Sequence, residues 1–455
     1  MMRLEGESVA VIGLGASGAA AARLALAKGG EVYVSDSSTD ASTTARGADL
    51  GAAGAAVELG GHDLERLAGA GLVVVSPGIP PDAPVLRALA ERGVRWISEP
   101  ELAFRFYSGP LIAVTGTNGK TTTTLLVAHL LEASGIRAAA GGNVGGGLAP
   151  AASELALLAE PPDWYVLEMS SFQLAGIESF RPDIGVVTNL SPDHLDRYAD
   201  VASYFADKAR LFDNADASSR WILPAGDETV ARLAGEAAGS RYHFGGEADS
   251  GSHAYVADGA LTLRIAHAVE AVLPAAELPL LGRHNVDNAL AAALTARLVG
   301  AGVEGIAAGL RSARPLPHRL EPVAERGGVL WVNDSKATNV AATRSALASL
   351  DRPVVILLGG KDKGEDFRAL GPALRERVRH ALAFGAAGPR IADELRDTVP
   401  LDLMGSDFPE VVARAASLAQ PGDLVLLSPA CSSYDMFENY EHRGRRFAEL
   451  AGEVS

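Results

Sequence analysis

One stretch, Leu111–Thr124, constrains the fold of this chain more than any other. An apolar run over 111–115 leads into Gly-Thr-Asn-Gly-Lys-Thr at 116–121, and leucines then recur at helical spacing. This pattern predicts a strand, a glycine turn and a helix, whose first backbone N–H groups can hold phosphate. Lys120 adds a positive charge, and the hydroxyl of Thr121 can reach a magnesium ion. We therefore predict an ATP site, against the alternative of a plain turn with an incidental lysine.

The spacing of this loop departs from the common rule, because its first glycine lies closer to Lys120 than in the usual eight-residue phosphate loop. That departure weakens the match to the common phosphate loop as much as it narrows the set of nucleotide-binding families to which the chain can be compared.

Size and charge limit the possible functions further. The chain has 455 residues, which predicts about three domains. Its formal net charge of −16 argues against a nucleic acid partner, because such proteins normally present a basic face. The single cysteine, Cys431, fits a reducing compartment, and no apolar run is long enough to span a bilayer. We expect a cytoplasmic enzyme that is monomeric and has no membrane partner.

The first predicted domain, residues 1–108, begins with a second glycine turn. A strand ends in Gly-Leu-Gly-Ala-Ser-Gly at 13–18, and the next strand ends at Asp36. This is close to the dinucleotide fingerprint, in which the turn approaches a pyrophosphate and the acid meets a sugar. An NAD enzyme and an enzyme with a UDP-linked ligand both fit. A third strand stops at the turn around Ser76 and Gly78, which is either a ligand contact or a plain turn.

The second predicted domain, residues 109–313, places polar residues after several strands. Glu168 ends one strand, where a magnesium ligand is expected downstream of a phosphate loop. Asp193 and His194 follow the next strand, at the sheet edge where such folds bind ligands. By pattern alone, Lys208 among apolar helix neighbours is a snorkelling surface lysine. Later, Asn285 and Asn288 lie three residues apart on a helix and suit base or phosphate contacts, or capping.

The third predicted domain, residues 314–455, opens after a proline-marked joint. Three apolar strands each deliver a polar loop: Asn333–Asn339, Gly359–Gly364 and Ser428–Asp435. Helical stretches lie between these strands. The pattern predicts an α/β domain with a nucleotide- or substrate-facing edge.

Taken in order, these motifs resemble the ATP-dependent Mur ligases of peptidoglycan synthesis. The resemblance rests on the 116–121 loop, Glu168, Asp193-His194, the Gly-Arg-His-Asn start of a helix at 282–285, and His318-Arg319 with the 333–339 loop. The run Ser-Pro-Ala-Cys-Ser-Ser at 428–433, with Tyr-Glu-His-Arg-Gly at 440–444, is most similar to the branch of the family that adds D-glutamate to UDP-N-acetylmuramoyl-L-alanine. The resemblance covers essentially the whole chain.

This resemblance implies an α/β fold of three domains: a Rossmann-like N-terminal domain for the UDP group, a central P-loop ATPase-type domain with a parallel sheet, and a Rossmann-like C-terminal domain for the amino acid. It implies ATP, two magnesium ions, glutamate and UDP-N-acetylmuramoyl-L-alanine as ligands, and an acyl-phosphate intermediate. His194 or a nearby carboxylate would take the proton of the amine. In this family a lysine on the helix after the histidine is carbamylated, and Lys208 matches that position. The resemblance therefore replaces the prediction that Lys208 is a snorkelling surface lysine.

Site residues follow from the same resemblance. ATP would contact Gly116, Thr117, Asn118, Gly119, Lys120, Thr121, Thr122, Asn285, Asn288, Arg319 and Asp334. The UDP substrate would contact Gly15, Ala16, Ser17, Gly18, Asp36, Ser37, Ser76, Gly78 and Asn143. The amino acid would contact Lys336, Thr338, Lys363, Ser433 and Tyr440. Metal ligands would be Thr121, Glu168, His194 and the carbamate of Lys208, and the catalytic residues would be Lys120, Glu168, His194 and Lys208.

Two departures from the family pattern lie in the amino-acid pocket. The position of Tyr440 is commonly Phe, and Lys361 accompanies Lys363, so either lysine could meet the glutamate carboxylate. They leave open whether D- or L-glutamate is added. Other amide ligases of the superfamily, an NAD-dependent oxidoreductase and a regulatory nucleotide-binding module remain as alternatives.

Overall fold

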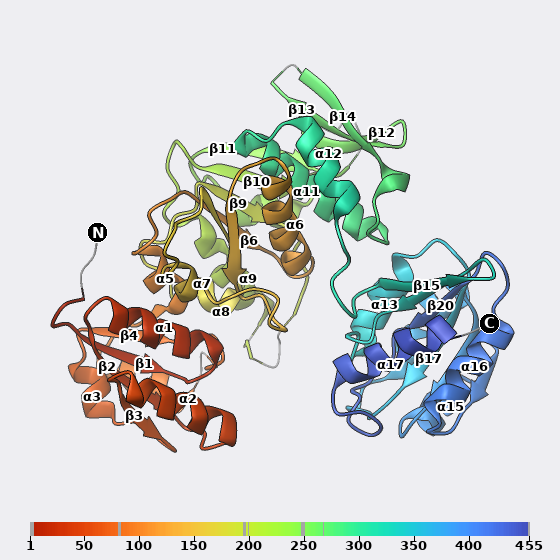
Figure 1. The fold of residues 1–455 in the computed structure, drawn as a ribbon, viewed down its shortest axis with the longest axis horizontal. Coiled ribbons are helices and arrows are strands. Elements are labelled where there is room, and N and C mark those ends of the chain that lie inside the picture. The colour runs from red at the N-terminus through yellow and green to blue at the C-terminus, as the bar shows by residue number, and fades with distance from the viewer. Residues whose placement is uncertain are drawn as a thin grey trace. The chain divides into compact units, whose positions relative to one another are not determined.

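The computed structural model describes residues 4–80, 83–193, 197–198, 200–246, 251–266 and 268–453. Its strands form three sheets (Figure 1). Contacts divide the chain into two compact units: one holds Met1–Ala275 with Asp287–Arg311, and the other holds Ala276–Val286 with Ser312–Ser455. The first two sheets belong to the first unit and the third sheet to the second. Within these described ranges, no helix is both long and apolar enough to cross a membrane.

The first sheet is parallel, in the order β3-β2-β1-β4-β5. Its strands are β1 (Ser8–Ile12), β2 (Glu31–Asp36), β3 (Ala56–Leu59), β4 (Leu72–Val75) and β5 (Ile97–Ser98). Its helices are α1 (Ala16–Ala27), α2 (Ala41–Ala52), α3 (Leu64–Gly69), α4 (Pro84–Glu91) and α5 (Glu99–Phe104). A Cβ on Gly18 would lie 1.8 Å from the carbonyl oxygen of Gly13, so the glycine lets α1 start directly against the turn.

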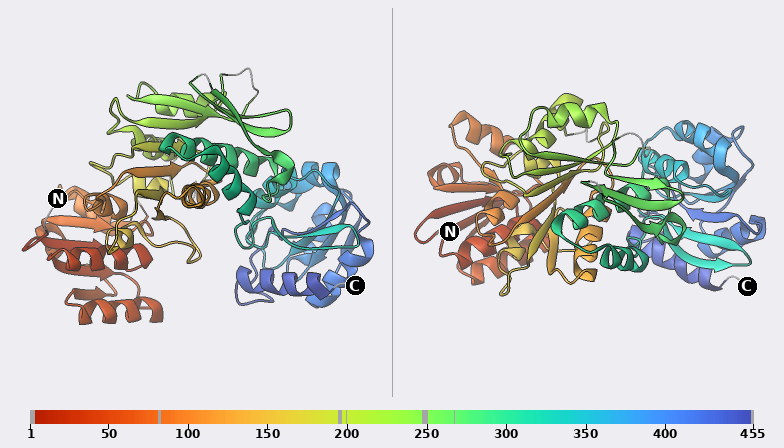
Figure 2. Two further views of the ribbon diagram at one scale, coloured as in Figure 1. Left: turned by 45° about the horizontal axis from the view of Figure 1, so that its top comes forward. Right: turned by 90° about the horizontal axis from the view of Figure 1, so that it is seen from above.

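The central sheet contains the phosphate-loop strand, in the order β14-β13-β12-β11-β10-β9-β6-β8-β7. Its strands are β6 (Leu111–Thr115), β7 (Ala138–Gly142), β8 (Trp164–Glu168), β9 (Ile184–Val187), β10 (Arg220–Pro224), β11 (Ser240–Phe244), β12 (Ala254–Ala257), β13 (Ala260–Ile265) and β14 (Ala268–Pro274). Pairing is parallel from β7 to β12 and antiparallel from β12 to β14. The antiparallel strands form the green edge in Figure 2.

Helices connect the central strands and carry several predicted site residues. They are α6 (Lys120–Ala133), α7 (Ala152–Leu155), α8 (Ser171–Leu174), α9 (Val201–Ala209), the 3-10 turn η1 (Arg210–Phe212), α10 (Glu228–Ala234), the 3-10 turn η2 (Ala275–Glu277), α11 (Arg283–Val299) and α12 (Val303–Ser312). Because β6 lies between β9 and β8, the loops that follow these three strands share one sheet edge.

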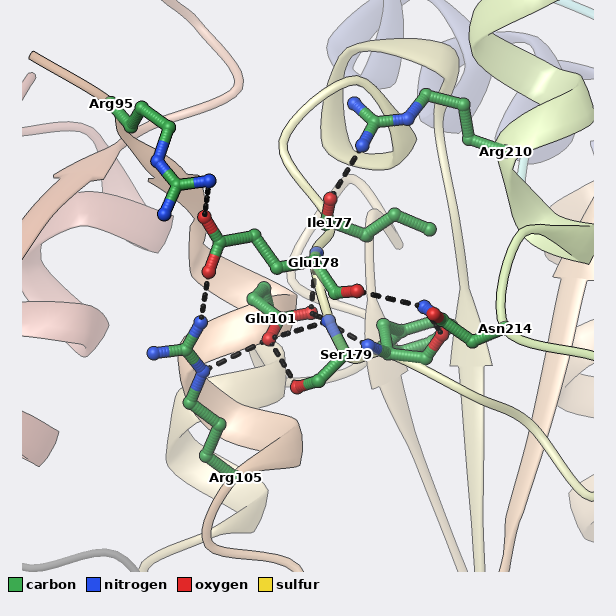
Figure 3. A network of polar contacts seen from close by, with 9 residues as sticks. Arg95, Glu101, Arg105, Ile177, Glu178, Ser179, Arg210 and Asn214 are labelled. Atoms are coloured by element: carbon green, nitrogen blue, oxygen red, sulfur yellow. Dashed lines mark hydrogen bonds and ion pairs between the residues drawn. The ribbon is translucent and has the colours of Figure 1, made fainter.

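Glu101 joins the first sheet's α5 to the loop before β9. This carboxylate is fully buried and accepts hydrogen bonds from the backbone N–H groups of Glu178, Ser179 and Phe180 at 3.0, 3.1 and 2.8 Å. The Ser179 hydroxyl and the Arg105 guanidinium also donate to it, at 2.6 and 2.9 Å (Figure 3). A buried carboxylate is stable only with such a set of donors.

A neighbouring acid in α5, Glu99, is also fully buried. Its Oε1 accepts the N–H of Ser153 at 2.5 Å, whereas Oε2 finds no partner among the described residues. Burial raises the pKa of Glu99 from 4.5 to about 7. The folded protein therefore keeps a proton that the unfolded chain releases between these two values.

This titration predicts a pH-dependent cost to stability. Between about pH 4.5 and pH 7 the folded state binds more protons than the unfolded state, so Glu99 lowers the free energy of unfolding as the pH rises. Glu99→Gln keeps an oxygen acceptor for the N–H of Ser153, and the amide does not ionise, so this position no longer makes stability depend on pH. We expect the variant to gain stability relative to wild type across this window, measured by urea unfolding at several pH values. A difference that does not change with pH would contradict the assignment.

The third sheet has the order β15-β16-β20-β17-β18-β19, antiparallel only between β15 and β16. Its strands are β15 (Glu321–Arg326), β16 (Val329–Asn333), β17 (Val354–Gly359), β18 (Val378–Phe384), β19 (Leu401–Leu403) and β20 (Leu424–Leu427). Its helical segments are α13 (Val340–Ala348), η3 (Phe367–Leu370), α14 (Gly371–Arg377), α15 (Gly388–Leu395), α16 (Phe408–Leu418) and α17 (Tyr440–Glu453).

Alternate residues of β17 enter two different cores on opposite faces of this sheet. Ile356 and Leu358 pack with residues of α13, α14 and α15, whereas Val355 and Leu357 pack with residues of α16 and α17. Helices therefore cover both faces (Figure 1). The three-domain α/β fold class predicted from the sequence is confirmed, while the boundaries after residues 108 and 313 stay predictions.

Candidate active site

The phosphate loop after β6 is held in shape by its own backbone and by the loop after β9. The N–H of Thr117 donates to Asn189 O at 2.9 Å, and the N–H of Asn118 donates to Asn189 Oδ1 at 3.0 Å. Gly119 caps α6 in the left-handed region, with φ of 82°, where a Cβ would also lie 2.4 Å from Asn288 Oδ1. Among the described residues no side chain caps this helix end, so its N–H groups suit an anion.

Oxygen and nitrogen atoms suited to a nucleotide and its metal gather around the start of α6. Lys120 Nζ donates to the carbonyl oxygen of Thr117 at 2.8 Å, across the loop. The Thr121 hydroxyl donates to Glu168 Oε2 at 2.7 Å, and Asn143 Nδ2 donates to Glu168 Oε1 at 3.1 Å. A buried carboxylate beside a hydroxyl is the kind of oxygen donor that Mg²⁺ prefers when it also binds phosphates. These residues therefore fit the predicted metal.

Lys208 corrects the interpretation of the helical pattern taken by itself. The side chain is only 1 % exposed, and Nζ donates to the carbonyl oxygen of Gly116 at 2.7 Å. Nζ also lies 4.8 Å from the centre of the Tyr204 ring. Burial, followed by the charge of Lys120, lowers the pKa of Lys208 to about 7. The spacing of Tyr204, Lys208 and Leu211 already placed the lysine on the inward face, a signal that the snorkelling interpretation neglected.

A cavity of about 450 Å³ opens between the turn after β4 and the phosphate loop after β6. Its lining combines Gly78 and Asn143, predicted for the UDP substrate, with Lys120 and Lys208. The other lining residues are Pro77, Ser170, Ser171, Phe172, Arg197 and Tyr204. Most of these had no sequence motif to mark them, and His194 lies outside the described residues.

The glycine turn of the first sheet lies at the carboxyl edge of that sheet. Asp36 accepts the N–H groups of Leu14 and Ser38 at 2.5 and 2.8 Å, so both carboxylate oxygens brace the backbone. Ser76 is buried beside the turn, its Oγ 3.8 Å from where a Cβ on Gly15 would lie. Ala16 and Ser17 begin α1, and Ser37 follows β2 at the exposed surface. These residues share one edge, as the fingerprint predicts.

The two asparagines of α11 belong to different compact units. Asn288 is buried and accepts from the Thr123 hydroxyl at 3.2 Å, behind the phosphate loop. Asn285 belongs to the second unit and donates to Leu281 O at 2.7 Å. Sequence spacing therefore did not reveal that Asn288 supports the loop. Thr122 lies in the first turn of α6.

In the second unit, the loops after β16, β17 and β20 and the first residue of α17 carry the residues predicted for the amino acid. Lys363 Nζ donates to Thr338 O at 2.9 Å and to Thr338 Oγ1 at 3.2 Å. Lys336 Nζ lies 5.4 Å from the centre of the Tyr440 ring. Lys361 instead forms a backbone bridge with Ser432, the neighbour of buried Ser433.

Asp334 lies beneath the same edge. It accepts the Ser428 hydroxyl at 2.7 Å and the N–H of Leu320 at 3.3 Å. Burial raises the pKa of Asp334 to about 7, and the charge of Arg319 partly opposes that rise. Arg319 therefore lies within electrostatic reach of Asp334, as expected if both serve one ligand.

Arg443 of α17 was not assigned from the sequence. The side chain is fully buried, and its guanidinium donates to Ser335 Oγ, Ser335 O and Cys431 O at 2.9, 2.9 and 3.1 Å. It thus ties together the loops after β16 and β20. The spacing of Arg443, Phe447 and Leu450 along α17 was the signal that it faces inward.

Comparison with known proteins adds to this geometry. Three family models match the chain: the MurD-like N-terminal domain of Mur ligases at residues 7–98, the Mur ligase middle domain at 114–296 and the Mur ligase glutamate ligase domain at 318–431. The UDP-N-acetylmuramoylalanine–D-glutamate ligase of Acidobacterium capsulatum is 43% identical over 453 residues, covering 99% of this chain and 97% of that protein.

Two further comparisons agree. The enzyme of the same name from Anaeromyxobacter dehalogenans is 44% identical over 463 residues, covering 99% of this chain and 98% of that protein. A solved pseudomurein peptide ligase type C from Methanothermus fervidus superposes with a TM-score of 0.59 at 20% identity, covering 99% of this chain and 100% of that one, which shows a shared fold.

Proposed function

Because the chain belongs to the Mur ligase family, we propose that it joins D-glutamate to UDP-N-acetylmuramoyl-L-alanine in peptidoglycan synthesis, with hydrolysis of ATP to ADP and phosphate. The observation that carries this proposal is the cavity in which Gly78, of the UDP-assigned turn, and Lys120, of the phosphate loop, line one space. A carboxylate on the UDP substrate can meet a phosphoryl group there. An NAD-dependent oxidoreductase would leave the phosphate loop unused, and the two full-length relatives described above are both ligases.

The first step activates the carboxylate, which is a poor acyl donor. A carboxylate oxygen forms a bond to the γ-phosphorus of ATP, the bond to the β,γ-bridging oxygen breaks, and ADP leaves with that electron pair. Lys120 and the N–H groups of α6 bind and orient the phosphates. Thr121 and Glu168 would hold magnesium, which neutralises phosphate charge when bound. The second metal and the role of His194 remain part of this proposal.

The second step forms the amide. The uncharged amine of glutamate attacks the carbonyl carbon of the acyl phosphate, the tetrahedral intermediate expels phosphate, and the nitrogen gives its proton to a base. His194 or a nearby carboxylate is our candidate for that base. Preorganised positive charge would stabilise the developing oxyanion.

A carbamate on Lys208 is the third part of the proposal. Because burial lowers the pKa of Lys208 to about 7, a useful fraction of the amine is uncharged at neutral pH and can add CO₂, with release of a proton. The product exchanges a buried cation for an anion beside the phosphate loop. A cytoplasmic location and a monomeric state also remain predictions.

The test of this function is phosphate release from ATP in the presence of UDP-N-acetylmuramoyl-L-alanine, with D-glutamate, L-glutamate or neither added. We expect release to require D-glutamate and the product mass to match the amide. Dependence on L-glutamate would reassign the amino acid, and no release in any mixture would reject the ligase. The same assay after removal of CO₂, with and without bicarbonate, tests the carbamate.

We expect Lys363, and not Lys361, to bind the glutamate carboxylate. The contact of Lys363 with Thr338 supports this choice, whereas the backbone of Lys361 is engaged with Ser432. Loss of a charge-assisted hydrogen bond costs roughly 1.5–3 kcal/mol, so Lys363→Ala should raise the KM for glutamate by about tenfold or more. Lys361→Ala is the matched control, and a larger effect there would reverse the assignment.

A further inference from the structure

The cavity beside the phosphate loop is lined by three basic side chains, Lys120, Arg197 and Lys208. Among the described residues that line it, none is a carboxylate. The mechanism above gives roles to Lys120 and Lys208 but leaves Arg197 without one. A guanidinium stays charged at any physiological pH, so Arg197 brings a permanent positive charge to this space.

An aromatic group holds Arg197 at the cavity wall. Its guanidinium carbon lies 5.4 Å from the centre of the Phe172 ring, and Phe172 stacks on Tyr198 with centres 5.3 Å apart and planes 12° apart. The hydroxyl of Tyr198 donates to Asp207 at 2.9 Å, which fixes that ring. Cation–π contact positions a guanidinium while leaving its N–H donors available to another group.

The same aromatic group reaches the phosphate loop. Tyr198 meets Tyr204 edge to face, with centres 5.4 Å apart. The Tyr204 hydroxyl lies 3.3 Å from Thr117 Oγ1, and its ring faces Lys208. Arg197 is therefore tied through two tyrosines to the loop that would hold ATP. In the described part of the chain no carboxylate pairs with Arg197, so its charge is available for a ligand.

We propose that Arg197 is a further catalytic residue. It binds the carboxylate of the UDP substrate and then the oxygens of the acyl phosphate as the acyl phosphate forms. The inference rests on the proposed function. The carboxylate of the UDP substrate and the γ-phosphate of ATP, both anions, must meet in the cavity. A guanidinium can bind a carboxylate or a phosphate with two parallel N–H donors. Arg197 transfers no proton: the carboxylate–phosphorus bond forms, ADP leaves, and Arg197 offsets negative charge throughout.

The experiment compares Arg197→Gln and Arg197→Lys with Arg137→Gln. Arg137 is a matched surface arginine whose side chain is 60% exposed and pairs with Asp163 at 2.7 Å. We expect Arg197→Gln to lower kcat by about 100-fold, as for loss of a transition-state donor, with an unchanged affinity for ADP. Arg197→Lys should recover part of the rate. An unchanged kcat, or an equal loss in the Arg137 variant, would overturn the proposal.

A binding measurement separates this role from a structural one. Calorimetry without ATP would compare UDP-N-acetylmuramoyl-L-alanine with its carboxamide analogue. The wild type should prefer the carboxylate, and Arg197→Gln should lower that preference by about tenfold, because a guanidinium forms charge-assisted hydrogen bonds with a carboxylate and not with a neutral carboxamide. Equal discrimination in both proteins would overturn the contact. If the wild type makes no amide, the ligase proposal fails, but this comparison still tests Arg197.

Discussion

Lys120→Ala should reduce ATP-dependent phosphate release by about a thousandfold or more and leave the binding of UDP-N-acetylmuramoyl-L-alanine almost unchanged. The charged side chain of Lys120 reaches across the phosphate loop, where its Nζ donates to the carbonyl oxygen of Thr117 at 2.8 Å. Phosphoryl transfer depends chiefly on positioning and charge neutralisation, so loss of this charge removes transition-state stabilisation. Steady-state phosphate release gives the first quantity, and calorimetry with the UDP substrate gives the second.

The variant should remain folded, because the loop is also held by the hydrogen bonds of Thr117 and Asn118 to Asn189. Lys28→Ala is the control, since Lys28 follows α1 in the first sheet and lies over the ring of Phe106. Near-wild-type turnover in Lys120→Ala would reject the ATP site. Loss of both turnover and UDP-substrate binding would show that the two sites are not separable.

Features encoded by short-range sequence patterns could be predicted. The phosphate loop and the first glycine turn each combine an apolar strand, glycines and a helix within about 20 residues, and both occupy the expected place in a parallel sheet.

Features that depend on distant partners could not be predicted. No sequence pattern marked Glu101, because its acceptor role depends on N–H groups 77 to 79 positions later in the chain. Arg197 lies in a polar stretch and meets Phe172 only through the fold. For Lys208 the helical spacing was informative, but the cost of burying a charge made a surface position look more favourable. The carbonyl of Gly116 and the lowered pKa resolve that conflict.

Glu101→Ala should destabilise the protein by about 3–5 kcal/mol, the usual cost of removing one partner from a buried charged network. The change leaves three successive N–H groups, from Glu178 to Phe180, and the guanidinium of Arg105 without their acceptor (Figure 3). Water cannot readily replace a fully buried carboxylate. The free energy of unfolding from urea titration, followed by both fluorescence and circular dichroism, measures the effect.

Glu178→Ala provides the matched control within the same network. Its side chain is 40% exposed and pairs with Arg105 at 2.9 Å and Arg95 at 3.9 Å, so its loss should cost less than about 1 kcal/mol. Glu101→Gln should fall between the two, because the amide keeps one acceptor oxygen. If Glu101→Ala is no less stable than Glu178→Ala, the buried carboxylate does not stabilise the contact between α5 and the loop before β9.

The effect of Glu101→Ala should extend to catalysis, because the loop that it binds also receives hydrogen bonds from the segment after α9. Arg210 donates to Ile177 O at 2.6 Å, and Asn214 donates to Glu178 O at 2.9 Å (Figure 3). Arg210 follows Lys208 by two residues, so one loop links α5 of the first sheet to the helix that carries the buried lysine. In the fraction of the variant that remains folded, we expect a higher KM for the UDP substrate and an unchanged affinity for ADP. The reason is that Gly78, after β4, and Lys120, after β6, line one cavity, and Glu101 connects the parts of the chain that carry them. An unchanged KM would show that Glu101 contributes to stability and does not affect binding of the UDP substrate.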